Sequence, residues 1–248
     1  KLIWKKNYYN KSEKKLNPIL SFATNGKVLI VADNISNYYA INNVSGELLW
    51  KMSNTSPFNS QIKIYKDRFY ITDYTNTLKS FLIKNGKEIW NYKTDSSFIK
   101  SQKKLSIAIK DQMIFFNNSI GDISALNIDD GRLLWQRPTQ NSLILENSFL
   151  FKNSNLVISK EAIIFSNNKN EFYSLNTNSG NLNWKQKINS NISPIIINDI
   201  IFTISNDGYL YLINSLKGNI FRVTDIFQNL KNKKSSKASP QGKDLTKL

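Results

Sequence analysis

The chain of 248 residues contains no cysteine and no histidine. It can therefore form no disulfide bond, no zinc site built on cysteine or histidine, and no catalytic triad that depends on an imidazole base. No apolar run approaches the roughly 20 residues that a membrane-spanning helix requires. Hydrophobic residues make up 40% of the sequence, which is enough for a sizeable core in a globular protein.

Acidic residues are also scarce, with 18 Asp and Glu against 34 Lys and Arg, so the formal net charge is +16. Only four of the basic residues are arginine, and six of the lysines fall in residues 231–248. No arginine-rich recognition helix and no aromatic nucleic-acid-binding motif accompanies this charge. We interpret it as a solvated basic surface and expect no nucleic-acid partner.

A short frame, Gly-x-x-x-Trp, recurs along the chain and contains four of the five tryptophans. The four copies pair Gly46 with Trp50, Gly86 with Trp90, Gly131 with Trp135, and Gly180 with Trp184. Trp4 looks like the end of a further copy, and Gly218 begins a fifth frame in which Arg222 stands in the place of tryptophan. The glycines are 40, 45, 49 and 38 residues apart, which is the period of propeller blades.

The residues before each glycine follow the same register. The residues five and eight places earlier are apolar in all five units, and thirteen places earlier stand small turn-forming side chains: Asp33, Asp73, Asn118, Asn167 and Ser205. Each unit divides into four short strands, in the first unit 19–23, 27–32, 37–41 and 47–51, of which we expect the first to lie on the outer side. The sequence thus predicts an all-β fold, a β-propeller of four-stranded blades with about five blades present.

Helix signals are nearly absent from the repeats. We expect residues 1–223 to form the propeller repeats. Thr224 and the residues after it predict a short helix, followed by a disordered basic tail that ends at residue 248.

The unit that runs from Ala125 and Leu126 through Asn127 and Gly131 to Trp135 resembles the PQQ-like β-propeller repeat family, named after pyrroloquinoline quinone. Within it the chain is most similar to the BamB branch of outer-membrane barrel-assembly lipoproteins. The resemblance implies an eight-bladed propeller, so the chain is expected to be a fragment that forms an open arc, with a closed five-bladed ring as the less favoured alternative. It also implies that Trp4, Trp50, Trp90, Trp135 and Trp184 dock between blades, next to Gly46, Gly86, Gly131 and Gly180.

The function implied by this resemblance is that of a non-catalytic scaffold at the periplasmic, inner face of the outer membrane. Its expected partner is the barrel-assembling outer-membrane subunit, and a lipid anchor would lie outside this segment. The candidate protein-binding residues are Leu143, Leu145, Glu146 and Phe149, because this stretch follows the third frame, where the spacing is longest. Glu146 stands where the family has an arginine, so the family site is not carried over as matched, and ordinary outer-strand packing with a bulge is the alternative that we favour for this stretch.

The alternative is a quinoprotein dehydrogenase, because that branch uses the same repeat. Its members hold the quinone between a tryptophan and a disulfide of adjacent cysteines, and they bind calcium through Glu, Asn and Asp. The chain has no cysteine, and we interpret Asp33, Asp73, Asp111 and Asp199 as turn or strand-end residues rather than as a catalytic aspartate. We therefore predict no catalytic residue, no metal site and no cofactor.

Overall fold

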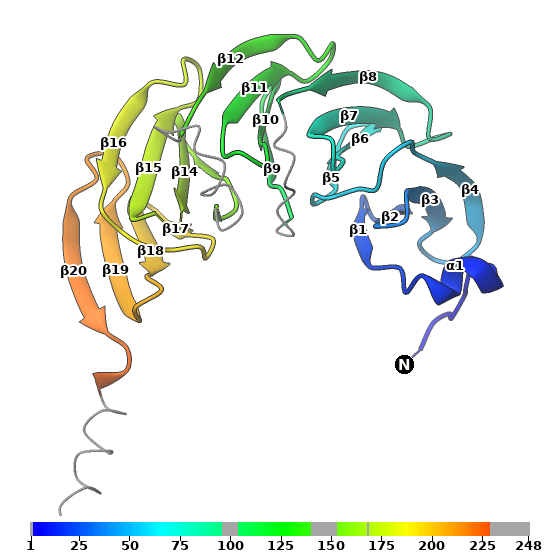
Figure 1. Cartoon of the computed structure of the whole chain (residues 1–248), viewed down its shortest axis with the longest axis horizontal. Coiled ribbons are helices and arrows are strands. Elements are labelled where there is room, and N and C mark those ends of the chain that lie inside the picture. The colour runs from blue at the N-terminus through cyan, green and yellow to red at the C-terminus, as the bar shows by residue number, and fades with distance from the viewer. Residues whose placement is uncertain (1, 96–103, 140–152, 168, 229–248) are drawn as a thin grey trace, which may run out of the picture.

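A computed structural model describes residues 2–95, 104–139, 153–167 and 169–228. Within these ranges twenty strands form five four-stranded antiparallel sheets, each built from strands that are consecutive in the chain. The sheets follow one another in an open arc, and the first and fifth sheets form its two ends (Figure 1). The predicted all-β architecture of five four-stranded blades is confirmed.

The strands of each blade have the following bounds. The first blade contains β1 (Leu20–Thr24), β2 (Val28–Asp33), β3 (Asn37–Asn42) and β4 (Leu48–Ser53). The second contains β5 (Lys63–Tyr65), β6 (Arg68–Thr72), β7 (Thr77–Leu82) and β8 (Glu88–Lys93). The third contains β9 (Ile107–Lys110), β10 (Met113–Asn117), β11 (Ile123–Asn127) and β12 (Leu133–Arg137). The fourth contains β13 (Val157–Ser159), β14 (Ala162–Asn167), β15 (Glu171–Asn176) and β16 (Leu182–Gln186), and the fifth contains β17 (Ile195–Ile197), β18 (Ile200–Ile204), β19 (Tyr209–Asn214) and β20 (Ile220–Asp225).

The order of strands across each blade corrects one expectation. The first strands lie on the inner side of the arc, where β1 contacts β5, β5 contacts β9 and β9 contacts β13, whereas the fourth strands lie on the outer side (Figure 1). The segment 19–23, expected on the outer side, therefore belongs to the inner side. Both positions are compatible with a short alternating strand, and contact between successive blades decides between them.

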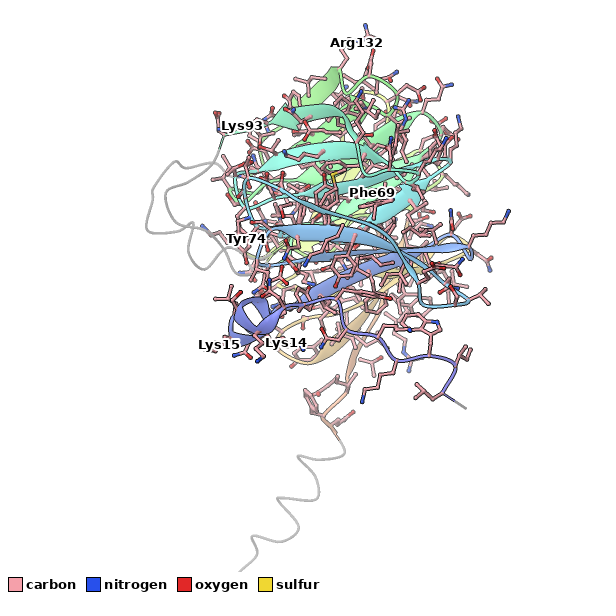
Figure 2. The ribbon with its side chains drawn as sticks, turned by 90° about the vertical axis from the view of Figure 1, so that its right-hand side faces the viewer. Lys14, Lys15, Phe69, Tyr74, Lys93 and Arg132 are labelled. Carbon is pink, nitrogen blue, oxygen red and sulfur yellow. The ribbon has the colours of Figure 1, made fainter. Side chains whose placement is uncertain are left out.

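The core lies between the blades, because the middle strands are covered on both faces. Ile30 and Tyr38 of the first blade pack with Phe69 and Phe81 of the second, and the rings of Phe69 and Phe81 stack with centroids 5.0 Å apart. Phe69 lies inside the stack of sheets, while Lys93 and Arg132 project from its periphery (Figure 2). A sheet that is apolar on both faces can be stabilised only as one member of such a stack.

One helix was not expected from the sequence. Residues 11–15 form α1 (Lys11–Lys15), which begins at a capping box: Asn10 accepts from the backbone of Glu13, and Glu13 accepts from the backbone of Asn10. The helix has no buried residue, so it carries no apolar periodicity that a sequence pattern could reveal. No helix among the described residues is long and apolar enough to cross a bilayer.

The end of the repeats lies later than expected. Thr224 pairs with Leu210 and Asp225 pairs with Tyr209, so both residues belong to β20 and the strand continues beyond residue 223. No helix begins at Thr224, because this segment completes a strand; Gln228, the last described residue, has helical backbone, so the predicted short helix stays a prediction for the residues that follow. The tail from residue 229 lies outside the described residues.

Candidate functional site

Each tryptophan of the repeat packs on a glycine of the following blade. Trp4 packs on Gly46, Trp50 on Gly86, Trp90 on Gly131, Trp135 on Gly180, and Trp184 on Gly218. At these five glycines a Cβ atom would lie only 2.6 to 2.8 Å from the nearest ring atom. The backbone φ is also positive at each of them, a conformation that glycine adopts at the lowest cost. Both the close approach and the backbone conformation therefore explain why the frame begins with glycine.

The same tryptophans form an equivalent hydrogen bond. In every slot the indole Nε1–H donates to the backbone carbonyl three residues before the glycine. The accepting oxygens belong to Asn43 (3.1 Å), Ile83 (2.9 Å), Ile128 (3.1 Å), Thr177 (2.9 Å) and Ser215 (3.0 Å). Each ring thus buries apolar surface and satisfies its polar group at one joint, which fixes the position of one blade on the next.

Local turn chemistry shapes each slot. In the third blade the N–H of Gly131 donates to the carbonyl of Asn127 at 3.0 Å. The side-chain oxygen of Asn127 accepts from the backbone of Asp129 at 2.9 Å and of Asp130 at 3.3 Å. The Asn127 side chain accepts from backbone N–H groups that the turn leaves without a partner, and so it stabilises the turn that contains Gly131.

The aspartates considered as catalytic candidates lie in separate places. Asp33 accepts from the backbone of Ile35 and Asn37, and Asp73 accepts from the backbone of Thr75 and Thr77, so both form the predicted turns.

The other two candidates are in turns between the first two strands of their blades. Asp111 has a φ of 53°, and Asp199 forms an ion pair with Lys160 at 2.6 Å. The four aspartates belong to four different blades, and no shared site brings them together.

The segment before the first blade occupies a slot without forming a strand. Trp4 packs on Gly46 as the other tryptophans do, the Tyr8 hydroxyl donates to the carbonyl of Gly46, and Tyr9 donates to Asp33 at 2.6 Å. Burial and the hydrogen bond to Asp33 raise the pKa of Tyr9. We call residues 2–16 the strap.

The strap is also held by an ion pair. Lys51 of β4 lies 2.7 Å from Glu13, and this hydrogen bond, with a smaller contribution from the backbone of Asn10, lowers the pKa of Glu13. The sequence indicated Trp4 but not Glu13 or its partner.

The fifth blade departs from the repeat at two paired positions. In the other blades the tryptophan lies opposite a small residue, as Trp50 lies opposite Ala40, whereas Arg222 of β20 lies opposite Leu212. Leucine is larger than the alanine or serine that lies opposite each tryptophan in the other four blades. Arg222 is exposed, so no described residue receives it as a glycine receives a tryptophan.

The residues do not fit the quinone site of the alternative interpretation. All five indole rings are committed to slots, and four of them, Trp50, Trp90, Trp135 and Trp184, are on outer strands. No three Asp or Glu side chains gather as a metal site within the described ranges, and the chain has no cysteine for the flanking disulfide. We therefore derive no reaction step through a quinone.

The predicted protein-binding residues Leu143, Leu145, Glu146 and Phe149 lie outside the described residues. Their role stays a prediction from the sequence.

The sheets and slots define a β-propeller repeat protein with blades of the PQQ-like type. The chain belongs to the BamB family, because the family described as "Outer membrane protein assembly factor BamB" matches residues 1–224. No curated protein matches the sequence.

Solved structures share the fold at low sequence identity. BamB from Moraxella catarrhalis is 16% identical, with a TM-score of 0.70 over 83% of this chain and 63% of that protein. A computationally designed protein is 13% identical, with a TM-score of 0.63 over 83% of this chain and 61% of that one. A quinohemoprotein alcohol dehydrogenase from Pseudomonas putida is 11% identical, with a TM-score of 0.62 over 83% of this chain and 41% of the enzyme. The chain thus spans less than two thirds of the length of each.

Proposed function

We propose that the chain is a non-catalytic scaffold that binds partner proteins in outer-membrane β-barrel assembly, at the periplasmic, inner face of the outer membrane. The observation that carries this proposal is the contrast between the joints and the connections. The joints repeat one geometry five times, whereas the connections between blades, at residues 54–62, 94–106, 138–156 and 187–194, differ in length and sequence. Variable loops on a constant frame are where recognition tends to evolve.

The two connections that the structure describes in full, 54–62 and 187–194, share one face of the molecule. Because strands alternate in direction within a blade, each connection starts at the same edge as the turn between the second and third strands. Hydrogen bonds join the two kinds of loop directly: Asn54 N–H donates to Ser36 O at 2.7 Å, and Asn206 N–H donates to Asn189 O at 2.7 Å. A partner that binds this face would therefore meet loops held by the sheet.

The partner we propose is the barrel-assembling outer-membrane subunit. Membership of the BamB family supports this choice, since that family is described as an outer-membrane protein assembly factor. Such binding would depend on a few apolar anchors rather than on the total area of the face.

A pull-down with the purified periplasmic domains of a barrel-assembling subunit tests the proposal. Ile192 is 48% exposed on a connection of the binding face, and Val44 is 75% exposed on a turn of the opposite face. We expect Ile192→Asp to weaken retention by at least about fivefold, and Val44→Asp to leave it unchanged. Failure of the unmodified chain to retain the subunit, or equal effects of the two variants, would count against the proposal.

A second arm addresses the enzymatic alternative. Purified chain mixed with pyrroloquinoline quinone and calcium should develop no bound chromophore and should oxidise neither alcohols nor sugars. A bound chromophore together with oxidation activity would favour the quinoprotein dehydrogenase over the non-catalytic scaffold.

A further inference from the structure

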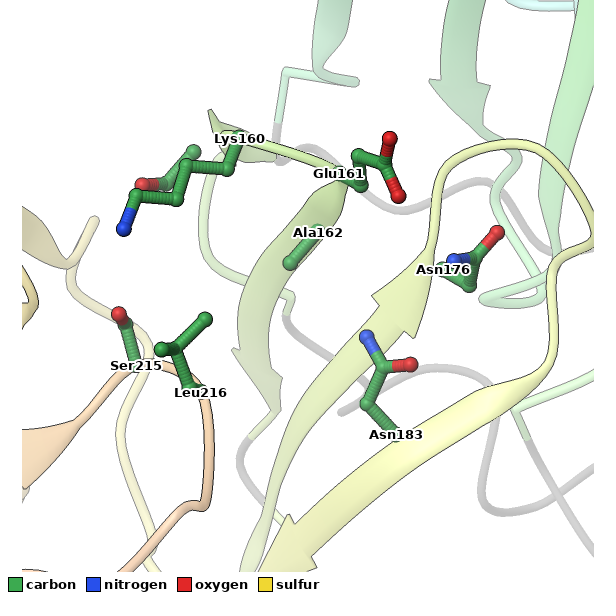
Figure 3. A pocket seen from close by; sticks show the side chains of 8 residues that line it. Lys160, Glu161, Ala162, Asn176, Asn183, Ser215 and Leu216 are labelled. Carbon is green, nitrogen blue, oxygen red and sulfur yellow. The ribbon is translucent and has the colours of Figure 1, made fainter.

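A pocket of about 660 Å³ lies at the joint between the fourth and fifth blades. Lys160 and Glu161 line it from the turn that joins β13 to β14, Ala162 lines it from the start of β14, and Asn183 lines it from β16. Ser215 and Leu216 line it from the turn that joins β19 to β20 in the fifth blade (Figure 3). Its volume is within the range of pockets that hold ligands.

One position of the repeat register differs between this joint and the joint of the second and third blades. Ala162 stands eighteen residues before Gly180, and Arg68 stands eighteen residues before Gly86 in the second blade. The Arg68 guanidinium crosses to the third blade, where Nη1 donates to the carbonyl of Asp129 at 2.7 Å. An arginine of the chain therefore bridges that joint, whereas alanine leaves the corresponding space open.

A second position departs from the repeat at the same pocket. Three residues after the glycine the first three blades carry partly exposed aliphatic side chains, Leu49, Ile89 and Leu134, whereas the fourth blade carries Asn183. The amide nitrogen of Asn183 donates to Ser174 Oγ at 3.2 Å, so its oxygen is the atom left to accept a hydrogen bond.

The wall from the fifth blade adds a buried polar group. Ser215 is only 5% exposed, and its hydroxyl has no hydrogen-bond partner in the part of the chain that the structure describes. Next to it, Leu216 stands two residues before Gly218, as Asp129 stands two residues before Gly131. The hydroxyl of Thr177, three residues before Gly180, is likewise buried without a partner among the described residues, so this feature belongs to the repeat position and not to the pocket alone.

The charges at the pocket favour a cation. Lys160 forms an ion pair with Asp199 at 2.6 Å. Among the residues that line the pocket, the carboxylate of Glu161 is then the charge for which the described residues show no ion pair. The apolar carbons of Ala162 and Leu216 complete a lining that suits an aliphatic stem with a charged tip.

We propose that this pocket receives an arginine side chain from another polypeptide, which fills the place that Arg68 fills between the second and third blades. Its aliphatic stem lies along Ala162 and Leu216, and its planar guanidinium donates to Glu161 and to the side-chain oxygen of Asn183. The identity of the polypeptide that supplies the arginine rests on the proposed protein-binding function. The pocket itself is formed by residues of this chain alone.

The test uses the whole ¹⁵N-labelled chain and three blocked tripeptides: acetyl-Gly-Arg-Gly-amide, the same peptide with citrulline, and the same peptide with glutamine. Citrulline keeps the shape of arginine without its charge. The arginine peptide should produce saturable shifts in the amide signals of Ala162 and Leu216 in the millimolar range, and the other two peptides should bind several-fold more weakly. Shifts that are absent from these signals, or that are equal for all three peptides, would overturn the proposal.

Matched variants locate the binding. Ala162→Arg supplies the side chain from within, as Arg68 does, and should abolish the shifts, while Ala162→Ser should retain them. Glu161→Gln should weaken binding by up to about fivefold, because the carboxylate is exposed to solvent. Arg68→Ala should open a second site, seen as new shifts near Asp129.

Binding that survives Ala162→Arg, in a variant whose other amide signals are unchanged, would contradict the proposal. The peptide experiment needs no barrel-assembling subunit. A negative peptide titration would therefore contradict the arginine pocket but not the proposed function. A negative pull-down would contradict the proposed function but not the arginine pocket.

Discussion

Replacing Gly131 by alanine should damage the joint between the second and third blades. The new Cβ would lie 2.6 Å from ring atoms of Trp90, and the residue would keep a φ of +73°. The backbone strain costs roughly 1–2 kcal/mol. Displacing a packed ring adds about 1–3 kcal/mol, because overpacking forces side chains off their preferred positions. We expect a total loss of about 2–5 kcal/mol in the free energy of unfolding.

Gly26 provides the matched control. Its φ is +92°, and a Cβ atom there would have no atom within 4 Å. Gly26→Ala should therefore cost only the backbone contribution, roughly 1–2 kcal/mol. The assay is urea unfolding followed by circular dichroism, with comparison restricted to variants whose dependence on urea is unchanged. Equal losses for Gly26→Ala and Gly131→Ala would refute the argument that the slot, rather than the backbone alone, requires glycine.

Three further variants test the charges and the turns. Lys51 lowers the pKa of Glu13 in the folded protein, so ionised Glu13 stabilises the fold above the ordinary glutamate pKa. This contribution to the free energy of unfolding is lost as the pH falls through the lowered pKa. In urea titrations from neutral to acid pH, Glu13→Gln should therefore lose less stability than the unmodified chain. Burial raises the pKa of Asp122 more than its hydrogen bonds lower it, so Asp122→Asn should raise the free energy of unfolding at neutral pH, and the gain should vanish in acid; a loss at every pH would contradict this. Asn176→Ala removes two backbone hydrogen bonds at 2.9 and 3.0 Å and should lower the melting temperature by an amount equivalent to about 1 kcal/mol, whereas Asn178→Ala should leave it unchanged.

The joints could be predicted from the sequence because each is encoded by local residues at a fixed spacing. Gly131 and Trp135 reveal the frame, and Asn127 reveals the turn that presents the glycine. The structure also shows which glycine each tryptophan contacts: Trp135 packs on Gly180 of the next blade, not on the glycine of its own frame. That direction depends on the order in which blades stack, which spacing alone does not contain.

The strap could not be predicted because its contacts are distant in sequence. Tyr9 meets Asp33, and Glu13 meets Lys51, but neither pair belongs to the repeat. The same reason explains the side on which 19–23 lies and the length of β20. Both depend on neighbouring strands and not on the local pattern.

The pocket at the fourth joint shows how repeats make a single residue informative. Ala162 is an ordinary strand residue by itself. Its importance follows from two observations together: it occupies the register position of Arg68, and the structure shows that Arg68 bridges two blades. The alignment was available in the sequence, but the bridge was not.

Hydrogen exchange of the five indole N–H groups tests the central claim most directly, since each is assigned a carbonyl of the next blade at 2.9 to 3.1 Å. We expect five indole signals that all exchange more slowly than in an unfolded chain, and Gly131→Ala should accelerate the exchange of Trp90 most. Rapid exchange of Trp50, Trp90, Trp135 and Trp184 in the folded protein would contradict it, because the blades would then be joined in some other way.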